Sequence, residues 1–259
     1  MNAEVKSFII GMEKAGRLAA ETLQYVKPYI KPGITTNEID QLVYDYTLSK
    51  GAKPAPLGYK GFPKSVCTSV NDCICHGLPD ETVLKDGDTI NVDVTSIVEG
   101  GFHGDTSATF YVGEVSEADK KLTKVAYEAM HKGILELGPG KRTGDVGFAV
   151  GKFVTKQGYF AVREIGGHGI GTVFHTDPFV PSHGKKGKGE RFQPWTCVTV
   201  EPMVNMNSLP FDEYDIPDSE IKYYLTQDGT PSAQFEHTVL ITDTGCEIMT
   251  QSGEEVFVP

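Results

Sequence analysis

Two aspartates, Asp93 and Asp105, have the residue type and the spacing to hold a cation between them. Residues 89–95 alternate apolar and polar side chains, which is typical of a half-buried strand, and the glycines after Glu99 predict a turn. A turn centred on Glu99 would place the two aspartates opposite each other, with Cβ atoms about 5 Å apart. Like charges in that position destabilise a sheet, and a cation between them reverses the effect. The alternative is a solvated polar face on which a bulge separates the two carboxylates.

Further candidate ligands lie in the second half of the sequence. Glu201 and Glu236 fall in the interior of two predicted strands, where acidic residues are depleted and costly to bury unpaired. His168 stands among glycines that let the backbone approach another group closely. The four carboxylates carry a charge of about −4, which two divalent ions would neutralise, and such oxygen-rich ligands favour Mn²⁺, Fe²⁺ or Co²⁺. Two metals about 3.5 Å apart can polarise a carbonyl group and stabilise the oxyanion that forms.

His76 and His175 are candidates for a different task. A neutral imidazole beside a metal can donate a hydrogen bond to a scissile amide or to its developing tetrahedral centre. A hydrogen-bonded structural histidine would look the same in the sequence, so the residue type alone leaves both interpretations open.

An internal repeat at an offset of 107 residues organises the chain. Residues 32–39 match residues 139–146 in their proline, glycine, threonine, acidic and β-branched positions, and each copy is followed at the same distance by a glycine, Gly51 or Gly158. Each copy predicts the start of a helix, with the threonine as N-cap and the acid in the first turn.

The repeat extends more weakly into the strands, and a longer helix is expected before each copy, at about 3–27 and 116–137. Asp93 matches Glu201, Asp105 is echoed by Glu236, and His76 by His168. The sequence therefore predicts a single domain over 1–259 built from two halves, about 1–115 and 116–259, which are related by a pseudo-twofold axis and present acids to one cleft.

Composition and charge limit the classes of function. A hydrophobic content of 39% with 23% charged residues is ordinary for a globular protein, while a net charge of −11 and a pI near 5.1 argue against nucleic-acid binding. The only basic cluster, residues 183–191, is best interpreted as a solvated loop, with a docking patch for an anionic partner as the lesser alternative. No apolar run approaches the roughly 20 residues that span a bilayer, and the N-terminus lacks a signal-peptide pattern. Five cysteines, an odd number, fit reduced thiols, so we expect a cytoplasmic protein that binds no membrane.

Seven short motifs together resemble those of the type I methionine aminopeptidases, in their short, bacterial-like form. The resemblance runs from about residue 5 to 257 and implies the α+β pita-bread fold, with antiparallel sheets, flanking helices and two pseudo-twofold-related halves. The motifs occupy residues 76–77, 91–95, 101–107, 167–171, 174–175, 200–203 and 232–238.

The resemblance also implies a role for each candidate residue. Asp93 would bind one metal in bidentate fashion, Asp105 and Glu236 would bridge two metals, and His168 and Glu201 would bind the second. A hydroxide between the metals would be the nucleophile, and Glu201 would relay protons as general base and acid. His76 and His175 would contact the substrate and stabilise the intermediate. The substrate would be a nascent polypeptide whose initiator methionine is removed when the second residue is small.

A methionine pocket and a monovalent-cation site are implied as well. The pocket would be lined by Tyr59, Phe62, Cys67 and Phe174, a wall of aromatic rings and sulfur suited to a thioether. Asn71, Cys73 and Ser232 match a structural Na⁺ or K⁺ site of some members.

The sequence departs from the family pattern at the pocket rim. Pro56 and Phe62 replace residues that are often cysteine and tyrosine, the segment 209–218 is longer than usual, and residues 222–224 stand where many members carry a tryptophan. These departures leave the ligands intact but change the rim that would accept the second substrate residue.

Two alternatives to this function remain. A peptidase of the same fold with Xaa-Pro specificity would use the same five ligands, although it would normally carry an additional N-terminal domain. A catalytically inactive binding homologue would lose ligands that this chain retains. Zn²⁺ is a further possible metal, and the expected partners are nascent chains, with a transient ribosome contact and a monomeric state.

Overall fold

A sheet of nine strands, all paired antiparallel, runs through the computed structural model, which describes residues 2–253 and 259. Two three-stranded sheets accompany it. The strands are β1 (Lys53–Pro54), β2 (Cys67–Val70), β3 (Cys73–Cys75), β4 (Thr89–Ile97), β5 (His103–Tyr111), β6 (Phe160–Ala161), β7 (Gly167–Ile170), β8 (Thr176–Val180), β9 (Cys197–Val200), β10 (Met203–Asn205), β11 (Phe211–Asp215), β12 (Lys222–Thr226), β13 (Ser232–Gln234), β14 (Glu236–Ile241) and β15 (Cys246–Ile248).

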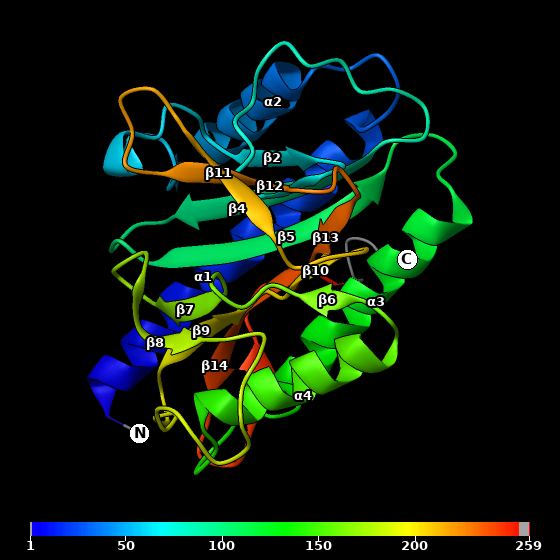
Figure 1. Cartoon of the computed structure of the whole chain (residues 1–259). Coiled ribbons are helices and arrows are strands. Elements are labelled where there is room, and N and C mark those ends of the chain that lie inside the picture. Colours follow the sequence, from blue (N-terminus) through cyan, green and yellow to red (C-terminus); the bar gives the residue numbers. More distant parts are fainter. Residues whose placement is uncertain (1, 254–258) are drawn as a thin grey trace.

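The order of the large sheet is β1-β4-β5-β14-β9-β7-β8, with β2 paired to β4 and β15 to β14. The central β5–β14 pair therefore joins strands from the two halves of the sequence, and each half contributes a neighbouring strand, β4 or β9 (Figure 1). The candidate ligands of both halves thus meet at the middle of one sheet.

Helices pack against this sheet and beside it (Figure 1). Helix α1 contacts β4 and β5, whereas α3 contacts α4, β9 and β14. The helices are α1 (Ala3–Val26), η1 (Lys27–Tyr29), α2 (Thr36–Ser49), η2 (Tyr59–Gly61), α3 (Glu117–Ile134) and α4 (Thr143–Lys156). Among the described residues, none of these helices is long and apolar enough to span a membrane.

The helices expected from the repeat are confirmed, with one correction. α2 and α4 have 14 residues each, at an offset of 107, and Gly51 and Gly158 follow them in left-handed conformation, with φ of 72° and 86°. A threonine caps only the first of them: the Thr35 side chain accepts from the Glu38 N–H. The threonine N-cap predicted for the second copy is wrong, because Arg142 occupies the cap and its own N–H donates to the Asp145 carboxylate.

The register predicted for the aspartate hairpin is also wrong. Thr95 lies opposite Asp105, and Ser107 lies opposite Asp93, so the two aspartates are diagonal neighbours. The turn is centred one residue later than predicted, because Gly100 and Gly101 both adopt positive φ, 88° and 80°. A shift of the turn by one residue moves the partner of every residue by two, which keeps both carboxylates on one face of the sheet.

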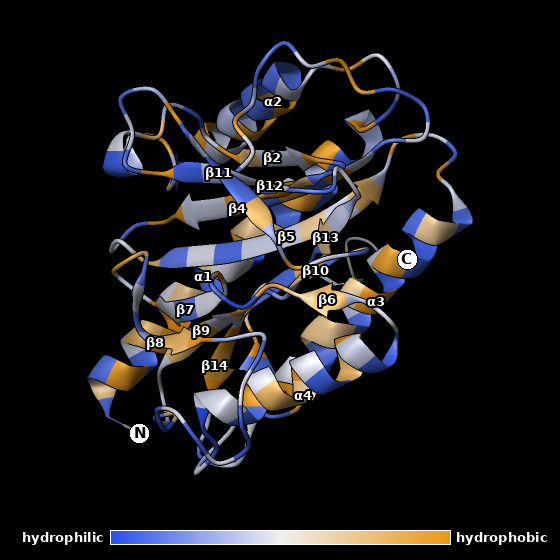
Figure 2. Ribbon diagram, in the orientation of Figure 1, coloured by the Kyte–Doolittle hydropathy of each residue, from blue (hydrophilic) through white to orange (hydrophobic). Residues whose placement is uncertain are grey.

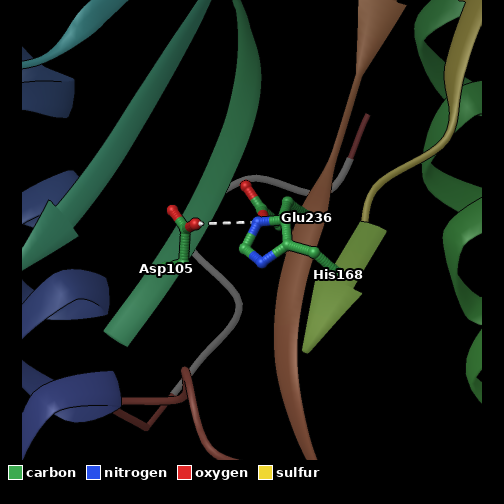
Figure 3. A group of neighbouring side chains, drawn as sticks. All are labelled: Asp105, His168 and Glu236. Atoms are coloured by element: carbon green, nitrogen blue, oxygen red, sulfur yellow. Dashed lines mark ion pairs between the residues drawn. The ribbon is translucent and has the colours of Figure 1, made fainter. Parts of the chain in front are cut away.

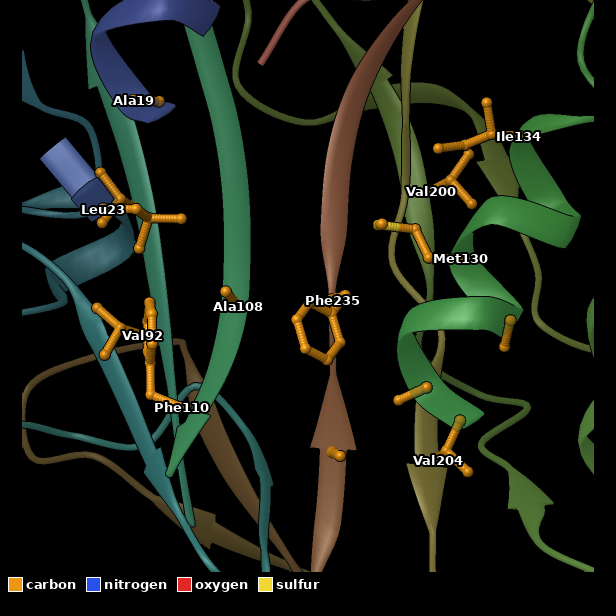
Figure 4. Packing of buried hydrophobic residues seen from close by; sticks show 14 of the residues in the cluster. Ala19, Leu23, Val92, Ala108, Phe110, Met130, Ile134, Val200, Val204 and Phe235 are labelled. Atoms are coloured by element: carbon orange, nitrogen blue, oxygen red, sulfur yellow. The ribbon is translucent and has the colours of Figure 1, made fainter. Parts of the chain in front are cut away.

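The hydrophobic core lies between the sheet and the helices (Figure 4). Phe110 of β5 and Phe235, which directly precedes β14, contribute large side chains to it. In the second half of the chain, Met130 and Ile134 of α3 pack near Val200. Figure 2 shows the corresponding pattern on α3 and α4, where hydrophobic and hydrophilic residues alternate around each helix. Burial of such side chains stabilises the fold by about 2 kcal/mol each, and it fixes the strands that carry the site.

Candidate metal centre

All five predicted metal ligands line one cavity. The same cavity is lined by both candidate histidines and by the four residues predicted for the methionine pocket. These eleven side chains are Asp93, Asp105, His168, Glu201, Glu236, His76, His175, Tyr59, Phe62, Cys67 and Phe174.

Three of the ligands form a compact group among residues 2–253 and 259. Asp105 on β5, His168 on β7 and Glu236 on β14 point toward one another, and one donor atom from each lies within 4.8 Å of the others (Figure 3). Glu201 directly follows β9, and its Oε1 lies 3.6 Å from His168 Nε2. Four neighbouring strands, β5, β14, β9 and β7, thus deliver ligands to one point.

The tautomer of His168 favours a cation in this group. Its Nδ1 lies 3.1 Å from the Gly169 carbonyl, to which it can only donate. Nε2 then carries a lone pair, yet it faces Asp105 Oδ2 at 3.7 Å and Glu201 Oε1 at 3.6 Å. Burial lowers the pKa of His168 to about 4, so the ring is neutral at pH 7. A lone-pair nitrogen and two carboxyl oxygens that converge in this way form a donor set that suits a metal ion.

The four carboxyl groups lie close together in the same cavity. Burial raises the pKa of Asp105 to about 7, and burial with the charge of Asp105 raises that of Glu201 to about 8. Burial and neighbouring charges also raise the pKa of Asp93 and Glu236 well above the usual range. Within the described part of the chain, Oδ1 of Asp93 and Oε1 of Glu236 are buried without a hydrogen-bond partner. Divalent ions would satisfy both the charge and the unpaired oxygens, so the residues present fit such ions.

Hydroxyl and amide groups hold two of the ligands in place. Thr95 Oγ1 donates to Asp105 Oδ1 at 2.7 Å, Thr199 Oγ1 donates to Glu201 Oε1 at 2.9 Å, and Gln234 Nε2 donates to Glu201 Oε2 at 3.2 Å. None of these three residues was predicted from the sequence as part of the site. Thr199 could have been predicted from the sequence, since it lies two residues before Glu201 and therefore shares its face of the strand.

The two candidate histidines are oriented by contacts from distant segments. His76 has a positive φ of 57°, and its Nδ1 lies 3.0 Å from the Lys222 carbonyl. His175 Nδ1 lies 3.1 Å from the Tyr59 hydroxyl, and its ring centroid is 4.2 Å from that of His168. Burial lowers the pKa of His76 and lowers that of His175 to about 3. Both rings are therefore neutral, so each can donate a single hydrogen bond.

Most of the remaining cavity lining is apolar. The ring centroid of Phe174 lies 4.9 Å from that of Tyr59, and Phe62 is buried beside Cys67. Burial raises the pKa of the Cys67 thiol well above its usual value, which keeps it uncharged. Pro56, noted in the sequence as a departure, lines the same cavity, together with Ile165 and Ile221, which sequence reasoning missed. No periodic pattern marks these two residues, because each belongs to an irregular segment.

The residues predicted for a monovalent cation come together away from this cavity. The Ser232 N–H donates to the Asn71 carbonyl at 2.9 Å, and Cys73 lies two residues beyond Asn71, which has a positive φ of 51°. Their role as cation ligands stays a prediction.

Known proteins that are similar to this chain are metallopeptidases. A model of metallopeptidase family M24 matches residues 11–243. Over 252 residues the chain is 44% identical to the methionine aminopeptidase of Rickettsia prowazekii (strain Madrid E), covering 96% of this chain and 95% of the relative. It is 47% identical over 240 residues to methionine aminopeptidase A of Synechocystis sp., covering 92% of this chain and 93% of the relative.

Solved structures confirm the pita-bread fold. The methionine aminopeptidase from Rickettsia prowazekii matches with a TM-score of 0.91 and 43% identity, covering 95% of this chain and 98% of that one. The prolidase from Pyrococcus horikoshii OT3 matches with a TM-score of 0.75 but only 18% identity, and the match covers 97% of this chain and 64% of that one, which shows a shared fold alone. On these grounds the chain belongs to metallopeptidase family M24 and, within it, to the methionine aminopeptidases of type I.

Proposed function

We propose that the chain hydrolyses the bond after an N-terminal methionine, in polypeptides whose second residue is small. The observation that carries this proposal is the neutral His168 Nε2, which faces the carboxylates of Asp105 and Glu201 at 3.7 and 3.6 Å inside a cavity with an aromatic and sulfur-containing wall. The name of the relatives, methionine aminopeptidase, supports the same substrate.

Five residues would hold two divalent ions in this cavity. Asp93 would bind one ion, His168 and Glu201 the other, and Asp105 with Glu236 would bridge them. When bound, the ions would polarise the scissile carbonyl and lower the pKa of a water molecule. Carboxylate-rich ligation favours Fe²⁺, Mn²⁺ or Co²⁺ and also accepts Zn²⁺.

Glu201 is the candidate for proton transfer. Burial and the nearby charge of Asp105 raise its pKa to about 8, which places the unloaded carboxyl near the operating pH of a general base and acid. Gln234 and Thr199 each donate to one of its oxygens, so the carboxyl is held in one orientation. Glu201 would take a proton from the attacking water and deliver it to the leaving amine.

His76 and His175 would stabilise the reacting amide. Both imidazoles line the cavity, and both are neutral at pH 7 because burial lowers their pKa. If Nδ1 of His76 donates to the Lys222 carbonyl, its Nε2 accepts, whereas the Tyr59 hydroxyl can donate to His175 Nδ1 and leave its Nε2–H free to donate. The geometry thus favours His175 as the donor to the developing oxyanion and His76 as an acceptor from the substrate backbone.

A peptide assay tests the proposal. Protein stripped of metal and then loaded under anaerobic conditions with Fe²⁺, Mn²⁺ or Co²⁺ should cleave Met-Ala-Ser and cleave Met-Leu-Ser far more slowly. Glu201→Ala should abolish turnover while the protein stays folded. Equal cleavage of Met-Ala-Ser by Glu201→Ala would refute the proton-transfer role, and a preference for a Xaa-Pro dipeptide would refute the substrate.

The Xaa-Pro alternative has weaker support. The prolidase is 18% identical to this chain, and the match leaves about a third of that structure uncovered, in keeping with the additional domain expected of that class. An inactive homologue is disfavoured because all five ligands line one cavity.

The remaining predictions concern the setting of the enzyme. We propose one catalytic domain made of two halves, a monomeric state, a cytoplasmic location and transient contact with the ribosome. A Na⁺ or K⁺ ion bound by Asn71, Cys73 and Ser232 would have a structural role.

A further inference from the structure

One wall of the cavity is built by a hairpin that carries none of the proposed ligands. Strand β11 is largely exposed and β12 is mostly half-buried, but the turn between them contains Ile216, whose side chain is 2% exposed. Ile216 packs in one cluster with Phe62 and Cys67, which line the cavity, and Ile221 packs against that cluster. The turn thus places an apolar anchor behind the cavity wall instead of extending into solvent.

The backbone of the turn is fastened to η2. The Glu220 N–H donates to the Lys60 carbonyl at 2.8 Å, and Ser219 Oγ donates to the same carbonyl at 3.1 Å. At Gly61, which has a φ of 82°, a Cβ would lie only 2.2 Å from the Asp218 carbonyl oxygen. In Figure 1 the hairpin, in orange, lies beside the cyan segment that contains η2.

The same turn reaches two groups that act on the substrate in the proposed function. η2 begins with Tyr59, whose hydroxyl contacts His175, so the fastening at Lys60 also sets the position of that pair. At the far end of the turn, the Lys222 carbonyl lies 3.0 Å from His76 Nδ1. Ile221, between these two attachments, is the residue of the turn that lines the cavity.

We propose that residues 216–222, the hairpin wall, determine which N-terminal side chain the cavity accepts. Ile221 is the specificity-determining contact, and Ile216 is the positioning residue that holds it. This inference rests on the proposed function, because it describes how the same cavity selects its substrate. Together with Phe62, Cys67 and the Tyr59–Phe174 pair, Ile221 encloses a narrow apolar space that suits an unbranched thioether chain and disfavours branched or aromatic side chains.

Substitutions at two positions test the hairpin wall. Ile221→Ala should raise KM for Met-Ala-Ser about tenfold, the usual effect of removing apolar contacts from a pocket. The ratio of kcat/KM for Met-Ala-Ser to that for Leu-Ala-Ser should fall by a similar factor. Ile216→Ala should shift the ratio in the same direction, and Ile216→Val should retain most of it. The matched control is Asp212→Asn, at an exposed position of β11 on the same hairpin, which should leave both parameters unchanged.

The outcomes separate this inference from the proposed function. If wild-type protein cleaves Met-Ala-Ser but both alanine variants keep its ratio of kcat/KM for Met-Ala-Ser to that for Leu-Ala-Ser, the proposed role of the hairpin wall is overturned. The proposed function then stands. If loaded wild-type protein cleaves no methionine peptide, both are overturned. Circular dichroism identifies a variant that fails to fold, and because Ile221 is only partly buried, its variant decides the question even if Ile216→Ala unfolds.

Discussion

The crowded carboxylates predict an unusual dependence of stability on pH in the metal-free protein. The pKa of Asp105 rises from 3.8 to about 7 and that of Glu201 from 4.5 to about 8, so the folded state binds protons more tightly than the unfolded chain. Stability contributed by such groups is present below the unfolded pKa and is lost as pH rises through the folded pKa, by about 1.4 kcal/mol per group and pH unit.

The histidines restrict where this loss can be measured. Burial lowers the pKa of His168 from 6.5 to about 4 and that of His175 from 6.5 to about 3, so these rings reduce stability as pH falls below 6.5, and their opposing effect fades within about one pH unit above it. Between pH 6.5 and 8, Asp105 and Glu201 together should therefore lower the free energy of unfolding by about 3 kcal/mol. Asp93 and Glu236 act in the same direction. For a chain of this size the loss corresponds to a decrease in Tm of about 6–12 °C.

The assay is equilibrium urea unfolding of chelator-treated protein across this pH range, with thermal melting in parallel. Stability should decrease from pH 6.5 to pH 8, and saturating Mn²⁺ should remove this loss, because bound divalent ions neutralise the carboxylates. Glu201→Gln, which cannot ionise, should show a smaller loss than the wild type. Metal-free stability that stays level or increases from pH 6.5 to 8 would refute the inference that these acids are held unpaired in one cavity.

Three further predictions concern individual residues. Asp105→Asn should lose bound metal and activity, because a central anion becomes a weak neutral ligand; unchanged metal stoichiometry by elemental analysis would contradict its bridging role. Thr199→Val should weaken metal binding about 10- to 100-fold in calorimetric titration, while Thr199→Ser, which retains the hydroxyl that donates to Glu201, should recover most of it; equal affinities of the two variants would contradict this. Gly104→Ala should lower Tm by several degrees or prevent folding, because a Cβ would lie 2.2 Å from the backbone of Ala15 on α1; a wild-type Tm would show that the helix can move away.

The local chemistry of the chain explains where sequence-based prediction succeeded. The 14-residue α2 and α4 could be predicted from a repeated helix start and a terminal glycine, since caps and left-handed glycines act within a few residues. The aspartate hairpin was predicted with the wrong register, because its turn depends on two consecutive glycines that can each adopt positive φ. Alternation of side chains along a strand survives that error, which is why both aspartates still face the cavity.

The sequence by itself determined the set of candidate ligands, because acids in strand interiors and a histidine among glycines stand out chemically wherever the strands lie. Only the tertiary structure decided how they meet: pairing of β5 with β14 brings Glu236 opposite Ser107, and packing of the β11–β12 turn brings Ile216 against Phe62. Neither contact leaves a local signal, since sheet pairing and apolar packing depend on which surfaces the whole chain can bury together. The residue types thus indicate the chemistry of a metal site, and the fold decides which side chains surround it.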